Sequence, residues 1–147
     1  MGDFNPQGLA NTAWAFATAD QKDASLFTAL ATAVERRMDG FNPQELANTA
    51  WAFATVDLKD ILLFTSLATA AERRMDGFNP QGLANTAWAF ATADQKDVLL
   101  FTALAIAAEQ RMDGFNPQQV TNTAWAFATM GQTDAVLLFA ALSAAAE

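Results

Sequence analysis

The sequence predicts an all-α fold, an α-solenoid of four stacked helix-turn-helix (αα-hairpin) repeats of 37 residues. The first observation is a repeated string, Phe-Asn-Pro-Gln-x-x-x-Asn-Thr-Ala-Trp-Ala-Phe-Ala-Thr, which begins every 37 residues at Phe4, Phe41, Phe78 and Phe115. A fixed period of roughly 20–50 residues is typical of repeat arrays. The second observation is that 52% of the residues are hydrophobic, and units this small bury apolar surface only by stacking on their neighbours.

We expect residues 1–147 to form a single repeat array. Its units cover residues 4–40, 41–77, 78–114 and 115–147, and the last unit is truncated. The link between the two helices of this last unit, Met130–Asp134, is one residue longer than its counterparts. The final residue, Glu147, aligns with Glu35 of the first unit, so we expect the chain to be part of a longer array.

The first helix of each unit is predicted over residues such as Pro6–Thr18. Asn5 is a good N-cap, and proline fits the first helical position. Helical spacing divides this segment into two sides. The apolar side holds Leu9, Ala10, Ala13, Trp14, Phe16 and Ala17, and its alanines permit a neighbouring helix to approach closely. The polar side holds Gln7, Gly8, Asn11, Thr12, Ala15 and Thr18.

The second helix of each unit is predicted from about Asp23 to Met38, with Gly40 near the left-handed position that ends many helices. Ser25 of this helix corresponds to Leu62 and Leu99 inside the array, and Thr32 corresponds to Thr69 and Ile106. A more polar first unit is typical of a terminal repeat with one face towards water. We therefore expect the apolar counterparts to be covered by neighbouring repeats.

The composition argues against catalysis. The chain has no His and no Cys, which removes the commonest general base and the commonest metal ligands. Its carboxylates stand at predicted links and helix ends, where capping and solvation explain them, and there is no Gly-rich phosphate loop. We expect no enzyme activity, no catalytic residue, no metal site, no cofactor and no small-molecule substrate.

Targeting segments, membrane spans and net charge can also be assessed from the sequence. No apolar run approaches the roughly 18 residues that span a membrane, and residues 1–6 carry neither a secretory signal nor a transit segment. The net charge of −8 opposes non-specific nucleic-acid binding, which depends on Lys and Arg. The same charge would suit a basic partner.

Polar residues of the first helices are the candidate binding residues. In a stacked array equivalent residues form rows, here Gln7, Gln44, Gln81 and Gln118, and Asn11, Asn48, Asn85 and Asn122. Their amides are suited to hydrogen-bonding a base edge or a peptide backbone. The alternative is that the asparagines bridge adjacent repeats or are simply solvated.

Aromatic and basic residues form further rows. Four tryptophans lie at the border of the apolar and polar sides, where a base could stack on them, although a place in the core between repeats is the alternative: Trp14, Trp51, Trp88 and Trp125. Five arginines at the ends of the second helices are candidate phosphate contacts, unless they pair with flanking carboxylates: Arg36, Arg37, Arg73, Arg74 and Arg111.

The unit that begins at Phe41 resembles the octotricopeptide-type repeat. It is also similar to the 37-residue heptatricopeptide repeats of organellar RNA-binding proteins. That group of helical repeats includes the FAST-kinase-like RAP-domain proteins and the subunit-6 domain of the RNA-editing substrate-binding complex. The most specific string, Pro-Gln-x-Leu-x-Asn-x-x-Trp-Ala-x-Ala, is present in three copies, and the fourth has Val120 at the Leu position.

The resemblance implies a superhelical solenoid that binds single-stranded RNA in mitochondria or chloroplasts, with roughly one nucleotide per repeat. Such proteins act in RNA processing, stability or translation, and protein partners are expected beside RNA. The resemblance also implies base-reading positions on the first helices. They are Gly8, Glu45, Gly82 and Gln119.

Two other functions are compatible with the pattern. Armadillo arrays present rows of Asn and Trp that hold an extended basic peptide, so a peptide- or protein-binding scaffold with an acidic surface is the main alternative. An array without any ligand is the third hypothesis. The charge around the first helices distinguishes them: a ring of Asp and Glu favours a basic peptide, and bordering rows of Arg favour RNA.

Overall fold

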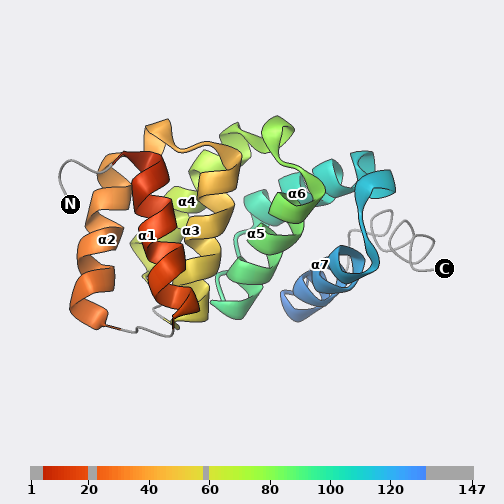
Figure 1. Cartoon of the computed structure of the whole chain (residues 1–147). Coiled ribbons are helices and arrows are strands. Elements are labelled where there is room, and N and C mark those ends of the chain that lie inside the picture. The colour runs from red at the N-terminus through yellow and green to blue at the C-terminus, as the bar shows by residue number, and fades with distance from the viewer. Residues whose placement is uncertain (1–4, 20–22, 58–59, 132–147) are drawn as a thin grey trace.

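The predicted all-α stack of helical pairs is confirmed. The structure, a computed structural model, describes residues 5–19, 23–57 and 60–131 (Figure 1). Over these residues it contains seven α-helices: α1 (Pro6–Thr18), α2 (Ala24–Arg36), α3 (Pro43–Thr55), α4 (Ile61–Arg73), α5 (Pro80–Thr92), α6 (Val98–Gln110) and α7 (Pro117–Thr129). Three 3₁₀ turns follow α2, α4 and α6, at Met38–Gly40, Met75–Gly77 and Met112–Gly114. The second half of the fourth unit, with most of its longer link, lies outside the described residues.

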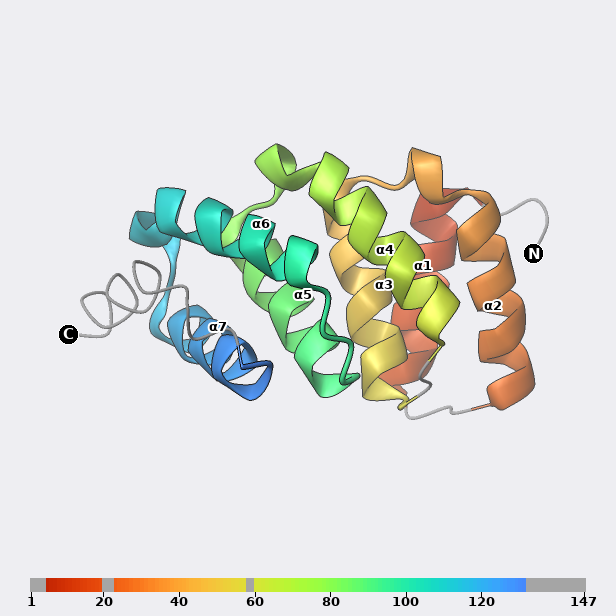
Figure 2. The same cartoon turned by 180° about the vertical axis from the view of Figure 1, so that it is seen from behind.

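The helices form two layers (Figures 1 and 2). We call α1, α3, α5 and α7 the A helices, and α2, α4 and α6 the B helices. The A helices pack tightly, each on the next along the row, whereas the B helices contact one another much less. The A layer is therefore the more closely packed of the two. Successive pairs also turn, from upright at α1 to steeply inclined at α7.

Capping residues determine where the helices begin. The side chain of Asn5 accepts a hydrogen bond from the backbone N–H of Gly8 at 2.8 Å, and the same cap recurs before every A helix. In α3 the Glu45 carboxylate also accepts from the backbone N–H of Asn42 at 2.9 Å, which completes a capping box. Gln119 does the same in α7. The predicted bounds of the first helix, Pro6–Thr18, are therefore confirmed.

The predicted end of the second helix is wrong. Helix α2 ends at Arg36, and Met38–Gly40 forms a separate 3₁₀ turn. Gly40 is not left-handed; the left-handed residues follow the A helices instead, at Asp57, Asp94 and Gly131. The turn glycines are needed for space, because a Cβ on Gly77 would lie 3.0 Å from the ring of Pro43, at the start of the same unit. Gly40 and Gly114 meet the first-helix proline of their own units in the same way.

Alanines on two sides of each A helix make the junctions between units. In α1, which has an A helix on one side only, Ala10, Ala13 and Ala17 are buried, whereas Ala15 and Ala19 are exposed. The first set, which we call the forward face, therefore packs on α3. The positions of Thr12, Ala15 and Ala19, which we call the back face, are buried in α3, α5 and α7. The assignment of Thr12 and Ala15 to the polar side is therefore wrong for every unit but the first.

Phenylalanines join the two layers across each junction. In α3, α5 and α7 the ring of the helix's phenylalanine packs edge-on against a phenylalanine of the preceding B helix. The centroid distances are 5.3 Å for Phe27–Phe53, 5.1 Å for Phe64–Phe90 and 5.1 Å for Phe101–Phe127. Each unit is thus anchored to the one before it by small residues in the A layer and by one ring pair between layers.

Some apolar residues of the B helices are not covered. Leu62 is 74% exposed and Leu99 is 72% exposed, and Ile61, Val98 and Ile106 are exposed with them. The expectation that stacking buries these positions is wrong. The B helices diverge from one another, so their outer sides have no neighbour to pack against within the described part of the chain.

Arginine side chains tie successive 3₁₀ turns together. Nη2 of Arg111 donates to the backbone carbonyl oxygen of Asp76 at 2.8 Å, and Arg74 donates to the carbonyl of Asp39 in the same way. These bonds span one unit of the array, so they stabilise stacking between units.

We expect Arg111→Ala to lower the free energy of unfolding by about 1 kcal/mol, because a charge-assisted hydrogen bond between units is lost. The control is Arg73→Ala, which removes the same charge from the exposed end of a B helix. Urea denaturation followed by circular dichroism measures both. Equal stability of the two variants would show that the Arg111 bond contributes nothing.

We expect Gly82→Glu to raise the free energy of unfolding by about 1 kcal/mol, because glycine weakens a helix and Glu45 forms a capping box at the equivalent position. The neighbours of Gly82 are close, since a Cβ added there would lie 3.2 Å from Cδ2 of Phe78, but the α3 counterpart accommodates a full side chain. Gly82→Ala separates helix propensity from capping. A variant Gly82→Glu that unfolds at lower urea than the parent would contradict this explanation.

Candidate nucleic-acid interface

Each A helix shows one narrow polar and aromatic stripe to solvent. The stripe contains Gln, Asn, Trp and Thr at positions i, i+4, i+7 and i+11, which helical geometry places within about 60° of one another. From the sequence, Trp was predicted on the apolar side of the helix and the other three on the polar side. Their spacing nevertheless indicates that all four lie on one stripe. We call the combined surface the amide face: Gln7, Asn11, Trp14, Thr18, Gln44, Asn48, Trp51, Thr55, Gln81, Asn85, Trp88, Thr92, Gln118, Asn122, Trp125 and Thr129.

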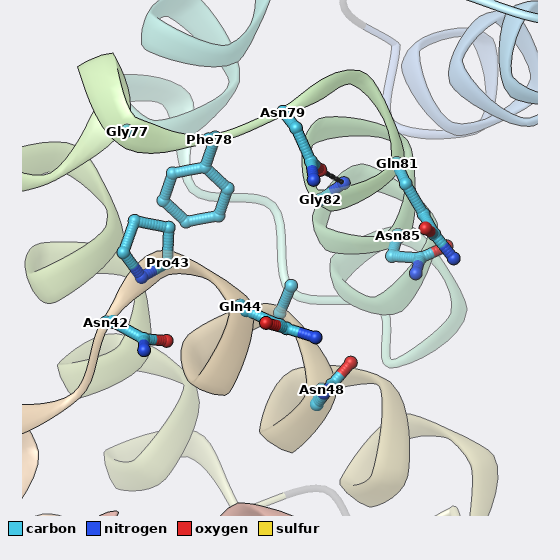
Figure 3. A pocket seen from close by; sticks show the side chains of 11 residues that line it. Asn42, Pro43, Gln44, Asn48, Gly77, Phe78, Asn79, Gln81, Gly82 and Asn85 are labelled. Atoms are coloured by element: carbon cyan, nitrogen blue, oxygen red, sulfur yellow. Dashed lines mark hydrogen bonds between the residues drawn. The ribbon is translucent and has the colours of Figure 1, made fainter. Parts of the chain in front are cut away.

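A groove of about 360 Å³ opens on the amide face between the starts of α3 and α5 (Figure 3). Gln44 and Asn48 line it from α3, and Gln81 and Asn85 line it from α5. Gly82, a candidate base-reading position, also lines the groove. The structure thus brings five of the sequence-predicted site residues together. Sequence reasoning did not find the capping residues Asn42 and Asn79 or the ring of Phe78, which also line the groove.

The amides around the groove are of two kinds, those that cap a helix and those that have no partner in the described part of the chain. Asn79 accepts from the backbone N–H of Gly82 at 2.7 Å, as Figure 3 shows. By contrast, no hydrogen bond to a described residue is found for the side-chain amides of Gln44, Asn48, Gln81 and Asn85. These asparagines therefore do not bridge adjacent repeats. Each amide keeps a donor and an acceptor available to solvent or to a ligand.

The other candidate residues lie at equivalent positions one unit away, on α1 and α7. Gln7, Asn11 and Gln118 are exposed, and Asn122 is half-buried. Of the base-reading candidates, Glu45 and Gln119 use a side-chain oxygen in their capping boxes. Gly8 lies in the first turn of α1 and has no side chain. The base-reading assignment stays a prediction.

The tryptophans form a row along the array. The ring centroids of Trp14 and Trp51 are 6.4 Å apart with planes inclined by 33°, and those of Trp51 and Trp88 are 6.5 Å apart at 29°. Trp51 and Trp88 are half-buried and pack against the core, whereas Trp14 and Trp125 are exposed. The indoles are thus part of the amide face, and those of Trp51 and Trp88 also pack against the core, which was the alternative place for them.

The charged residues stand at the edges of the amide face, which itself contains none. Arg74 and Arg111 bond the preceding unit, as described above, whereas Arg36 and Arg73 are exposed at the ends of α2 and α4. Arg37 is half-buried. These arginines alternate with Asp39, Asp76 and Asp113 near the starts of the A helices. The edge is thus mixed in sign, neither an acidic ring nor a continuous basic border.

Two carboxyls near this edge are perturbed. Burial raises the pKa of Glu35, and the nearby carboxylate of Asp60 raises it further. The pKa of Glu72 is raised in the same way, by burial first and then by Asp97. Both carboxyls lie at the ends of α2 and α4, beside Arg36 and Arg73.

Neither a metal site nor a membrane-crossing helix is found in the described part of the chain. Within residues 5–19, 23–57 and 60–131, no group of three or more Asp or Glu side chains is placed to hold a metal ion. None of the helices in these segments combines the length and the apolar character that a membrane crossing requires.

Comparison with known proteins identifies the family. A family model for the RNA-editing substrate-binding complex 6 protein matches residues 1–146. No curated protein matches the chain. The family implies a non-catalytic component of an RNA-editing complex that acts in mitochondria, with protein partners and RNA substrates. With the match covering nearly its whole length, the chain belongs to the RNA-editing substrate-binding complex 6 family, and its role lies in RNA processing.

Proposed function

We propose that the chain is a single-stranded RNA-binding module of a mitochondrial RNA-editing complex, and that RNA lies along the amide face. The array of residues 4–40, 41–77, 78–114 and 115–147 acts as one binding domain within a longer protein or assembly. Family membership supports the RNA-processing role, and the geometry of the amide face supports the binding mode.

The observation that carries the proposal is the groove between α3 and α5. Its four unpartnered amides can exchange hydrogen bonds with the edges of an unpaired base. The neighbouring indoles offer edges and faces on which a base can stack. A binding face with this chemistry recognises bases rather than phosphates, which explains why a chain of net charge −8 can still bind RNA.

Phosphate contacts would come from the edge of the array. Arg36 and Arg73 are exposed at the ends of α2 and α4, on the side where the A helices begin. Arg74 and Arg111 contribute only the parts of their guanidinium groups that the bonds between units leave unused. Few available cations imply a shallow dependence of affinity on salt, since the slope for single strands is about −0.7 per neutralised phosphate.

Gly82 lines the groove between α3 and α5 and has no side chain to fill it. At the equivalent positions Glu45 and Gln119 carry side chains, which fold back into capping boxes at the starts of their own helices. We therefore propose that the residue at this position regulates the space available to a base at each junction. Gly82→Glu, which is expected to stabilise α5, should then narrow this groove and weaken RNA binding.

We expect the double variant Asn48→Ala/Asn85→Ala to bind a random single-stranded RNA pool at least about tenfold more weakly, because two amide contacts of about 1 kcal/mol each are lost. Fluorescence anisotropy of labelled RNA measures the affinity. All four tryptophans lie on the amide face, so quenching of intrinsic fluorescence reports whether RNA occupies that face. The control is Gln110→Ala, an exposed amide on a B helix.

Two results would contradict the proposal. One is no binding by the parent chain even at low salt. The other is equal loss of affinity in Asn48→Ala/Asn85→Ala and in Gln110→Ala, which would place the contacts elsewhere.

An extended basic peptide is the second candidate ligand. The tryptophan rings are 6.4 and 6.5 Å apart, close to the rise of two residues in a strand, about 6.6 Å. Alternate side chains of a peptide could thus fall between successive indoles, and amides could hold its backbone. The same fluorescence assay with an arginine-rich peptide distinguishes the two: quenching by the peptide and not by RNA would assign the chain as a peptide-binding scaffold.

A further inference from the structure

Apolar and β-branched side chains on the outer sides of α4 and α6 have no cover in the described part of the chain. We call this surface the outer patch: Ile61, Leu62, Thr65, Val98, Leu99 and Ile106. It lies on the B layer, whose helices α4 and α6 are in front in Figure 2, and not on the layer that carries the amide face. Helix α4 has a described B helix on each side, so the exposure of Leu62 does not result from where the array begins or ends.

These residue types are unusual at exposed helical positions. β-branched residues such as Ile61 and Val98 lose side-chain freedom in a helix, and surface positions favour stronger helix formers such as Ala, Glu, Lys or Gln. At the equivalent positions the first B helix has Ala24 and Ser25, and it forms a helix of the same 13 residues. A B helix therefore folds without the outer patch, and a gathering of exposed apolar residues is typical of an interaction surface.

A groove of about 320 Å³, which we call the outer groove, opens in this patch between α4 and the start of α6. Its floor is formed by Phe64 and Phe90, the buried ring pair that joins the two layers at this junction. Thr65 lines it from α4, and Val98 and Leu99 line it from α6. A bulky apolar side chain of a partner can thus enter here and pack against aromatic rings.

The charge beside the outer patch is negative. Each of the three links that lead into α2, α4 and α6 carries two aspartates and one lysine. Asp60 and Asp97 cap α4 and α6, each with one oxygen that accepts from a backbone N–H at 3.0 Å. A full negative charge exceeds the partial positive charge of a helix start, about half an elementary charge. Lys96 reaches towards the next link, with Nζ 3.6 Å from the place of a Cβ on Gly131, so this edge of the patch attracts positively charged groups.

We propose that the outer patch binds an amphipathic helix of a partner protein, with an apolar stripe flanked by Lys or Arg. Apolar residues of that stripe, spaced i, i+3, i+4 and i+7, contact Leu62 and Leu99, and one of them enters the outer groove. Basic residues beside the stripe reach Asp60 and Asp97 at the starts of the two B helices. Because the amide face belongs to the other layer, this partner leaves the proposed RNA site open.

Other occupants fit these features less well. An extended strand gains affinity by pairing with a sheet edge, whereas the backbone groups of α4 and α6 are bonded within their helices. RNA would bring phosphates to an edge of carboxylates, and the outer patch contains no aromatic residue on which a base can stack. A second copy would bring two acidic edges together, and the net charge of −8 on each chain opposes that association.

A synthetic peptide of Leu and Lys, roughly four helical turns long with Leu at helical spacing, is the probe. Two control peptides have the same length. One has Glu in place of Lys, and the other has Leu and Lys in alternation, which makes one side of a strand apolar. Fluorescence anisotropy of the labelled peptides measures binding. Tryptophan fluorescence reports whether a peptide occupies the amide face instead, because all four tryptophans lie there.

We expect the helical Leu/Lys peptide to bind at least about tenfold more tightly than either control peptide, without quenching of tryptophan fluorescence. Leu62→Gln/Leu99→Gln should weaken this binding at least about tenfold, because the apolar contacts are lost. Ser25→Gln, at the equivalent exposed position of α2, is the matched control and should bind like the parent chain. Affinity of Leu62→Gln/Leu99→Gln for RNA should equal that of the parent chain, so this test is separate from that of the proposed function.

The contribution of charge is measured with Asp60→Asn/Asp97→Asn, because Asn caps a helix about as well as Asp. This variant should bind the helical Leu/Lys peptide about threefold more weakly and with less dependence on salt. Asp39→Asn/Asp76→Asn removes the same charge beyond the other ends of the B helices and should bind it like the parent chain. Circular dichroism verifies that each variant is folded.

Three results would overturn the proposal. One is a parent chain that binds the helical Leu/Lys peptide no more tightly than the control peptides. Another is unchanged affinity in Leu62→Gln/Leu99→Gln or quenching of tryptophan fluorescence, since either would place the peptide elsewhere. The third is a parent chain that dimerises in sedimentation velocity and becomes monomeric with Leu62→Gln/Leu99→Gln, which would assign the outer patch to a second copy.

Discussion

The close approach of the A helices is the constraint on which the other features depend. It requires small residues on two sides of each helix, which the forward and back faces supply. Bulky residues are then confined to the side that meets the B helices, where Leu9 and Phe53 are buried. Since the A layer is so compact, the B helices must diverge, and this leaves Leu62 and Leu99 exposed on the outer side.

The binding face is what remains once these demands are met. Forward face, back face and core take up most of the helix circumference, and only a stripe about 60° wide stays open. Gln, Asn, Trp and Thr fill that stripe in every unit. The tight packing also determines the spacing of the rows, so that the indoles lie 6.4 to 6.5 Å apart and amides from two helices share one groove.

Local signals in the sequence were sufficient to predict the A helices, since Asn5 and Pro6 define a helix start that needs no tertiary contact. Features that depend on three neighbours at once were not predictable in this way. A helical projection assumes one buried side, so Thr12 and Ala15 were assigned to solvent although the equivalent residues of later units are buried. Gly40 has the position of a helix-ending residue, but a glycine is needed there because the ring of Pro6, from the start of the same unit, leaves no room for a side chain. The rows of Gln and Asn were predictable; the groove between them required the structure.

The sameness of the junctions has a consequence for how such a protein evolves. Every internal contact joins the same two faces, so inserting or deleting a segment of 37 residues by unequal recombination creates no interface that must arise anew. The repeating pattern of the amide face is preserved as well, because each unit carries its own Gln, Asn, Trp and Thr. Under the proposed function, the length of the bound ligand could therefore change by whole units within a lineage, while point substitutions at positions such as Gly82 would adjust each unit separately.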